Sequence, residues 1–183
     1  MVNHALVIGG TGMLKDVSIH LSDKVKCLTV VGRSAAKMGN LKNCTNLNPI
    51  LADYSKDNFA DKIDEAMTKY GDISLVVSWI HATAPKATAA LVDVLKKQKT
   101  KVKYVDVRSS SVANPSNYID DRLILFEGSA NINYHQVLLG FVVEAKQSRW
   151  LTHAEISAGV IEAIKREHEK YIVGQVAPWD LRP

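Results

Sequence analysis

Short apolar runs alternate with helical patterns through roughly the first 110 residues of this chain, and this alternation restricts the fold more than any other feature. The predicted strands lie within 4–10, 27–34, 48–55, 72–82 and 101–111. Repeated strand–helix units predict a parallel sheet with helices on both faces. We therefore expect a doubly wound α/β fold with three layers and a mostly parallel sheet of about seven strands. Residues 1–183 should form one domain.

Local end signals refine the predicted helices. Ser55 is a candidate N-cap for a helix that Gly71 can end, and Pro85 suits the first turn of the next helix. Thr152 and Glu155 have the spacing of a capping box for a helix in the last third of the chain.

The rest of that last third reads differently from the first five units. The segments 122–128 and 133–145 are predicted strands around a short turn, and 171–176 is a predicted last strand. His135 and His153 are expected to be structural histidines.

Composition limits the class of protein. The formal charge is +4, and no stretch of 18 apolar residues occurs, so we expect neither a membrane partner nor a secretory leader. The lysine-rich run 96–103 lacks an aromatic platform, so no nucleic-acid partner is expected. Cys27 and Cys44 have no metal-type spacing, which fits free thiols, a cytoplasmic location and no bound metal.

The sequence "ALVIGGTGML" is the first candidate site, because its glycines fall between a predicted strand and a predicted helix. A turn in this position offers free backbone amides and the helix dipole to a diphosphate. Glycine allows the close approach that a side chain would block. The candidate cofactor-binding residues of this turn are Gly9, Gly10, Thr11, Gly12, Met13 and Leu14.

This turn resembles the first turn of the short-chain dehydrogenase/reductase superfamily, in particular its branches with G-x-x-G-x-x-G. Gly9 and Gly12 match the first two glycines, whereas Lys15 stands at the third. The resemblance covers roughly residues 3–115 and implies an NAD(P)-binding, Rossmann-like fold. The first five strands should then lie in the order 3-2-1-4-5. It further implies that Asp53, with Tyr54 beside it, lies near the adenine. By the same resemblance, the segment with Ser78, Trp79, Ile80 and His81 lies against the cofactor ribose.

The end of the second predicted strand indicates which nucleotide binds. An acidic residue there would favour NAD, but "VVGRSAAK" has none. Arg33 can pair with a 2′-phosphate, Ser34 can add a hydrogen bond, and Lys37 follows one turn later. We therefore expect NADP(H) as the cofactor.

The catalytic pair of the superfamily is missing from the sequence. No tyrosine is followed four residues later by lysine, and the nearest arrangement is Tyr118 with Arg122. Three catalytic candidates remain: Tyr118, Ser109 at the end of the fifth strand, and His81, because histidine is the residue type best suited to proton transfer near neutral pH. Asp106 and Arg108 alternate on one strand face and are expected to form an ion pair beneath the site.

Two functions follow from these residues. The first is an NADP(H)-dependent oxidoreductase of atypical short-chain dehydrogenase type that acts on a small carbonyl or imine. The second is a non-catalytic NADP(H)-binding redox sensor or regulatory protein, similar to the nitrogen-regulator branch of the superfamily. The chain is shorter than an ordinary short-chain dehydrogenase, and the missing length lies at the substrate-binding end. We therefore expect either a small substrate or a site completed in a homo-oligomer.

Overall fold

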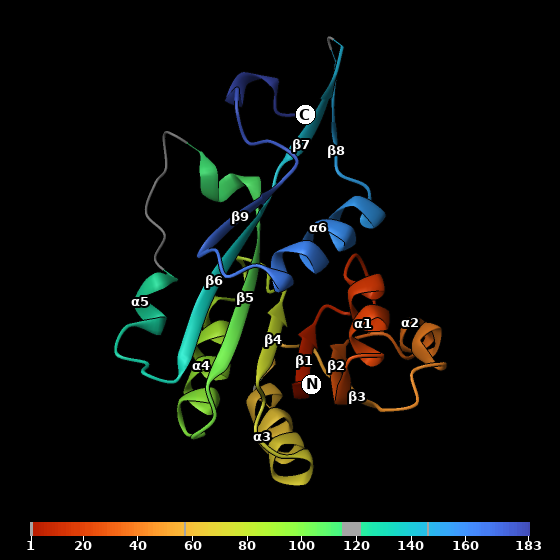
Figure 1. Cartoon of the computed structure of the whole chain (residues 1–183), viewed down its shortest axis with the longest axis vertical. Helices are drawn as coiled ribbons and strands as arrows, with labels where there is room; N and C mark the ends of the chain where they lie inside the picture. Colours follow the sequence, from red (N-terminus) through yellow and green to blue (C-terminus); the bar gives the residue numbers. More distant parts are fainter. Residues whose placement is uncertain (1, 57, 115–121, 146) are drawn as a thin grey trace.

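Seven parallel strands form the central sheet of the protein (Figure 1). The computed structural model describes residues 2–56, 58–114, 122–145 and 147–183. The strand order is β3-β2-β1-β4-β5-β6-β9, so the predicted order of the first five strands is confirmed. The strands are β1 (Val2–Ile8), β2 (Val25–Gly32), β3 (Leu47–Leu51), β4 (Leu75–Ser78), β5 (Val102–Ser109), β6 (Ile132–Leu139) and β9 (Lys170–Val173).

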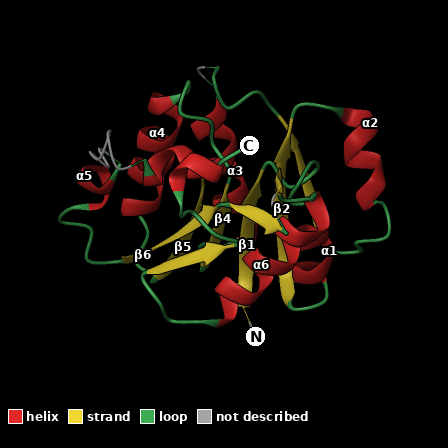
Figure 2. Ribbon diagram, turned by 90° about the horizontal axis from the view of Figure 1, so that it is seen from above, coloured by secondary structure: helices red, strands yellow, loops and turns green. Residues whose placement is uncertain are grey.

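Helices cover both faces of the sheet, which gives the expected three layers (Figure 2). One face carries α1 (Lys15–Ser22), the short α2 (Ala35–Met38) and α6 (His153–Lys165). The other carries α3 (Phe59–Tyr70), α4 (Pro85–Lys96) and α5 (Leu123–Phe126). Three single turns of 3-10 helix occur at Gly39–Leu41, Ser110–Ala113 and Trp179–Leu181.

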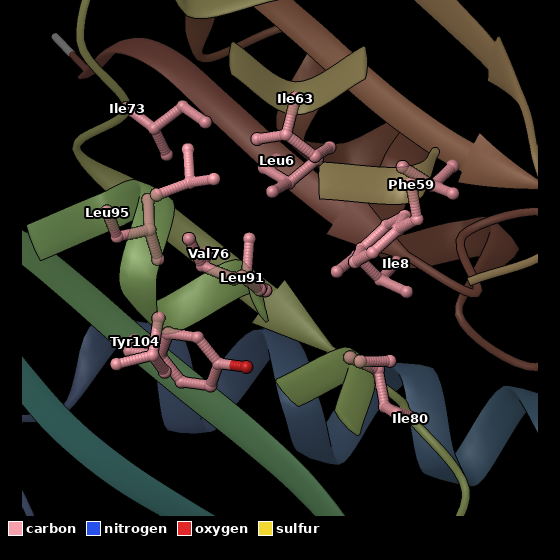
Figure 3. Packing of buried hydrophobic residues seen from close by; sticks show 14 of the residues in the cluster. Leu6, Ile8, Phe59, Ile63, Ile73, Val76, Ile80, Leu91, Leu95 and Tyr104 are labelled. Atoms are coloured by element: carbon pink, nitrogen blue, oxygen red, sulfur yellow. The ribbon is translucent and has the colours of Figure 1, made fainter. Parts of the chain in front are cut away.

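Both faces of the central strands are apolar, because each face packs under helices. Leu6 of β1 belongs to one core cluster, where Phe59 of α3 and Leu91 of α4 pack on the same side of the sheet (Figure 3). The next residue, Val7, belongs to the cluster on the opposite side, together with Val17 of α1. This alternation explains why the sequence shows continuous apolar runs instead of alternating ones.

The last third departs from the predicted strands in two places. The segment 122–128 was expected to be a strand, but residues Leu123–Phe126 form the helix α5. A run of four apolar residues is compatible with either a strand or a helix by pattern alone. In the structure the helix buries the side chain of Phe126.

The predicted strand 133–145 is divided at Gly140 into β6 and β7 (Phe141–Glu144). A side chain on Gly140 would collide with the backbone of Gln175, which pairs with Phe141 through hydrogen bonds of 2.9 Å. Strand β7 turns away from the main sheet and pairs with β8 (Gln147–Trp150) in a hairpin that projects beyond it (Figure 1).

Three of the predicted helix ends are confirmed, and one is wrong. Thr152 and Glu155 form the expected capping box at the start of α6. Gly71 ends α3 with a φ of 87°, and Pro85 stands in the first turn of α4. The N-cap of α3 is Asn58 instead of Ser55. Ser55 does not cap the helix; its backbone amide and its hydroxyl both donate to the carboxylate of Asp53.

Candidate functional site

A cleft of about 650 Å³ opens at the carboxyl ends of the strands on either side of the point where strand order reverses. The reversal lies between β1 and β4, where open parallel sheets bind ligands. The lining residues come from five separate parts of the chain. They are Gly9, Thr11, Gly12, Met13, Val31, Gly32, Arg33, Ser34, Lys37, Ala52, Tyr54, Trp79, His81 and His153.

A larger hollow of about 730 Å³ lies between α2, β3 and α3, at the edge of the sheet. It contains neither the glycine turn nor the end of β4. The cleft, and not this hollow, therefore contains the residues that the sequence predicts to bind a nucleotide.

Each glycine of the turn after β1 occupies a position that suits glycine for a different physical reason. Gly9 has a φ of 79°, a conformation that side chains disfavour, and it lies against Trp79. A side chain on Gly10 would collide with Ser18 of α1, so this glycine allows the helix to pack on its strand. A side chain on Gly12 would meet open space, because the nearest contact of an added Cβ would be the Gly9 carbonyl oxygen, 3.9 Å away. The Gly12 position thus keeps room for a ligand without being required by the fold.

The backbone amides of this turn provide the site's hydrogen-bond donors. The amides of Gly9 and Gly12 donate to backbone carbonyls at 3.1 and 3.3 Å. Those of Gly10, Thr11 and Met13 have no acceptor within the part of the chain that the structure describes. Helix α1 also begins without a side-chain cap. Free amides next to an open helix N-terminus are the arrangement that binds phosphate groups.

Leu14, the last candidate of the turn, is fully buried in the core. Its side chain packs among the apolar residues under α1. Any contact between Leu14 and a ligand in the cleft is therefore through the backbone.

Basic side chains lie where β2 ends. Arg33 is exposed and lines the cleft, and Lys37 lines it from α2. Ser34 also lines the cleft, but its hydroxyl already accepts a hydrogen bond of 3.3 Å from the Lys37 amide and so caps α2. Arg33 and Lys37 are therefore the cations available to a phosphate at this end of the cleft.

The segment after β3 places Tyr54, and not Asp53, in the wall of the cleft. The Asp53 carboxylate accepts hydrogen bonds of 3.0 and 2.6 Å from Ser55, and these bonds lower its pKa. The Tyr54 hydroxyl accepts a long hydrogen bond of 3.5 Å from the backbone amide of His81. This contact joins the segment after β3 to the segment after β4.

The four candidates at the end of β4 divide by side-chain direction. Ser78 and Ile80 are buried, so their side chains lie outside the cleft. Trp79 and His81 line it, with their rings edge to face at 5.4 Å between centroids. Two cleft-facing rings on alternate residues follow from the period of two in extended chain.

Ser109 stands at the carboxyl end of β5, outside the lining of the cleft. Its exposed hydroxyl lies 2.5 Å from that of Ser111. Tyr118 lies outside the described residues. The structure thus places His81 in the cleft and leaves Ser109 at a neighbouring strand end.

A buried ionic cluster lies beneath this edge, centred on the fully buried Asp106. Arg108 is 3.5 Å from its carboxylate, which confirms the expected ion pair, and Arg122 is 3.1 Å away. Tyr134 donates to the same carboxylate at 3.0 Å. Burial raises the pKa of Asp106, and the two guanidinium groups oppose that rise.

Arg122 also donates to the Ile80 carbonyl at 2.7 Å, so its guanidinium ties β5 to the segment after β4. Both of its terminal nitrogens are engaged in these buried contacts. Arg122 is therefore held in a structural network, which distinguishes it from the lysine that would activate a tyrosine.

The sequence did not identify His153 as a residue of the cleft. It was expected to be structural, as His135 is, whose ring bonds to the His168 carbonyl at 2.8 Å. His153 is instead the first residue of α6 and lines the cleft. The only local signal was the capping box, which fixes His153 at a helix start without showing what that helix end faces.

Helix α6 is held against the glycine turn by a bond between distant residues. The Ser157 hydroxyl donates to the Met13 carbonyl at 2.8 Å. Packing of α6 beside α1 therefore decides the position of His153 (Figure 1).

Comparison of the fold with solved structures gives one consistent group. The match to the bulky-bulky ketone specific alcohol dehydrogenase from Comamonas testosteroni has a TM-score of 0.72 and 13% identity, and covers 98% of this chain and 89% of that one. A short-chain dehydrogenase from Burkholderia cenocepacia in complex with NADP gives 0.69 and 14%, over 98% and 91%. The chain shares the fold of the short-chain dehydrogenases.

A third similar structure is Pen from Bacillus thuringiensis, with a TM-score of 0.66 and 19% identity over 93% of this chain and 68% of that one. No protein-family model matches the sequence, and neither does any curated protein. At identities this low the likeness establishes the fold, and the activity has to be argued from the site.

Two further properties concern the described residues only. None of their helices combines the length and apolar character that crossing a bilayer requires. They contain no group of three or more histidine, cysteine or acidic side chains arranged to hold a metal ion.

Proposed function

We propose that the protein binds NADP(H) in the cleft and is an oxidoreductase of atypical short-chain dehydrogenase type, acting on a small carbonyl or imine. The single observation that carries this proposal is the set of unpaired amides of Gly10, Thr11 and Met13 beside the open start of α1. These amides match what a diphosphate needs, and they lie at the reversal of strand order. Structures with the same fold include enzymes crystallised with NADP and NADPH.

The residues around the turn fit the rest of the nucleotide. Arg33 and Lys37 supply cations for the 2′-phosphate, and Tyr54 contributes an aromatic wall. Asp53 keeps its proposed place near the adenine, although its carboxylate is also engaged by Ser55. When bound, the nicotinamide supplies the hydride chemistry. The protein then has to orient the substrate, exclude water and supply a proton.

His81 is the proposed proton donor. Its imidazole lines the cleft, and its edge contact with Trp79 limits the orientations of the ring. The ordinary pKa of histidine allows transfer from a ring nitrogen to a developing oxyanion or amide near neutral pH. The Ser109 hydroxyl is proposed to orient the substrate from the end of β5, and Tyr118 remains an alternative donor on sequence grounds.

A sensor without turnover is the second candidate function. It is favoured by the missing Tyr-x-x-x-Lys pair and by the capture of Arg122 in the ionic cluster. Both functions share the nucleotide site, so one series of measurements separates them.

The test begins with NADPH binding, which is measured by the quenching of tryptophan fluorescence. Trp79 is the reporter because it lines the cleft. A panel of small aldehydes, ketones and cyclic imines then measures NADPH oxidation. We expect saturable binding and turnover, and His81→Gln should lower kcat about 100-fold or more because general acid catalysis contributes that much. His168→Gln, at an exposed histidine outside the cleft lining, is the matched control and should retain most of kcat.

The outcomes separate the candidates. Binding without turnover on the whole panel would favour the sensor. Absence of binding by either nicotinamide nucleotide would reject both functions.

We also propose that the protein is a cytoplasmic homo-oligomer. The exposed apolar side chains Ile124, Trp150 and Ile172 support association, and the free thiols Cys27 and Cys44 fit a reducing compartment. Sedimentation velocity on the purified protein tests the association, and a single monomeric species would contradict it.

A further inference from the structure

We propose that a second cavity, separated from the cofactor cleft by Tyr54, binds a small carboxylate that has an apolar body. This cavity measures about 380 Å³, within the usual size of small-molecule sites. It lies between the first turns of α3 and α4 and the segments that precede them. Of the described residues, Tyr54 alone lines both spaces.

The interior of the cavity is apolar. Phe59 is 1% exposed, and its ring meets that of Tyr54 edge to face, with 6.4 Å between centroids. On the opposite wall, Ala84, Ala87 and Ala90 recur at three-residue steps along one face of α4. Small side chains at these steps leave space that leucine or isoleucine would fill. The part of a ligand that enters furthest must therefore be apolar.

Among the described residues that line the cavity, the charged side chains are of one sign. Lys56 and Lys86 line it, both are exposed, and its described lining contains no acidic side chain. Helix α4 starts beside them at Pro85, and Ala84 in the N-cap position offers no side-chain acceptor to the first-turn amides. Two ammonium groups and the positive end of a helix dipole favour an anionic headgroup. An apolar interior with a cationic rim thus selects an amphipathic anion.

The binding of the carboxylate is measured without NADP(H), so its outcome is independent of the proposed oxidoreductase function. The probe is 1-anilinonaphthalene-8-sulfonate, an anion that fluoresces in apolar surroundings, and octanoate is the displacing ligand. Octyltrimethylammonium has the same chain with the opposite charge and is the matched control ligand. We expect saturable binding of the probe, displacement by octanoate and no displacement by the cation.

Variants assign the binding to the cavity. The double variant Lys56→Glu/Lys86→Glu should weaken probe and octanoate binding about 10-fold or more, because attraction becomes repulsion. Ala90→Leu, at a half-buried position, should weaken it similarly by filling the cavity. Lys96→Glu/Lys97→Glu, at the far end of α4, is the control and should change affinity less than about 2-fold. Thermal unfolding of each variant verifies that it is folded.

Three results would overturn the proposal. The first is charge reversal that leaves octanoate affinity unchanged in a folded variant. The second is equal displacement by the octyl cation. The third is that AMP displaces the probe completely from wild type and still does so from Arg33→Asp. The cavity would then be part of the adenine site.

Discussion

Helices α1 and α6 both begin at the cofactor cleft, but their N-termini are finished in opposite ways. Helix α1 has Leu14 at its N-cap and no side-chain hydrogen bond to its first turn. Helix α6 has a complete capping box, in which Thr152 accepts from the Glu155 amide and Glu155 accepts from the Thr152 amide. Arg149 of β8 adds hydrogen bonds of 2.9 and 3.0 Å to the Glu155 carboxylate.

The difference indicates which helix start can hold an anion. A helix N-terminus attracts phosphate through amides that lack partners, and α1 retains such amides in the turn before it. In α6 a carboxylate of the protein already occupies that position. Helix α6 therefore contributes the His153 side chain to the cleft, while the open start of α1 provides the charge environment for the proposed diphosphate.

The largest expected effect comes from closing the open helix start. Gly12→Glu places a carboxylate where the proposed diphosphate binds, and Gly12 has free space around it, so the fold should persist. We expect NADPH affinity to fall about 100-fold or more, since repulsion replaces attraction at a helix N-terminus. Calorimetric titration measures the affinity, and an unchanged value would remove the glycine turn from the site.

The next effect concerns the end of β2. Arg33→Asp should reverse the preference for NADPH over NADH by about 10-fold or more, because a guanidinium that pairs with the 2′-phosphate becomes a carboxylate that can bind a ribose hydroxyl. The comparison needs both dissociation constants for each variant. Lys42→Asp, in the turn after α2 and outside the cleft lining, is the charge-matched control. Equal shifts in the two variants would show a general charge effect instead of recognition.

A smaller effect is expected at the closed helix start. Thr152→Ala removes the capping hydroxyl and should lower the free energy of unfolding by about 1 kcal/mol. NADPH affinity should stay within about 2-fold of the wild-type value, because the first-turn amides of α6 are not part of the proposed nucleotide site. Urea unfolding and NADPH titration of the same preparation test both halves. Loss of binding at full stability would reverse our assignment of the two helices.

The smallest effect is a pH dependence of stability from the same cap. The hydrogen bond from Arg149, aided by the Thr152 amide, lowers the pKa of Glu155 from 4.5 to about 2. Because the folded pKa is the lower one, the contribution is complete above pH 4.5 and is lost as the pH falls toward 2. Arg149→Met should flatten this part of the profile. Lys24→Met is the control, and equal flattening in both variants would exclude Glu155 as the cause.

Several features were predictable because they depend on neighbours in the sequence. The glycine turn, the capping box at Thr152 and the helix end at Gly71 are set by interactions within a few residues. The order of the first five strands followed from the resemblance of the glycine turn to a Rossmann-like family, and the structure confirms it. Residues at strand ends, such as Arg33 and His81, were then brought to one edge by the parallel arrangement.

Other features depended on contacts between distant segments, which a local pattern does not contain. The apolar run Leu123–Phe126 fits a strand or a helix by pattern alone, and in the structure it is a helix, α5, that packs beside α4. Ser55 lost its expected capping role to a hydrogen bond with Asp53. The direction of each side chain at the end of β4 separated the core residues Ser78 and Ile80 from the cleft.

The sequence by itself determined a parallel sheet, a glycine turn at its first strand end and a cation at its second, because periodicity, turn chemistry and charge are properties of adjacent residues. Only the tertiary structure decided that His153 faces the cleft, since that depends on α6 packing beside α1 through the bond from Ser157 to Met13. It also decided that the start of α6 is closed by Arg149 while the start of α1 stays open. The free energy of such contacts depends on which surfaces meet, and the chain brings those surfaces together only on folding.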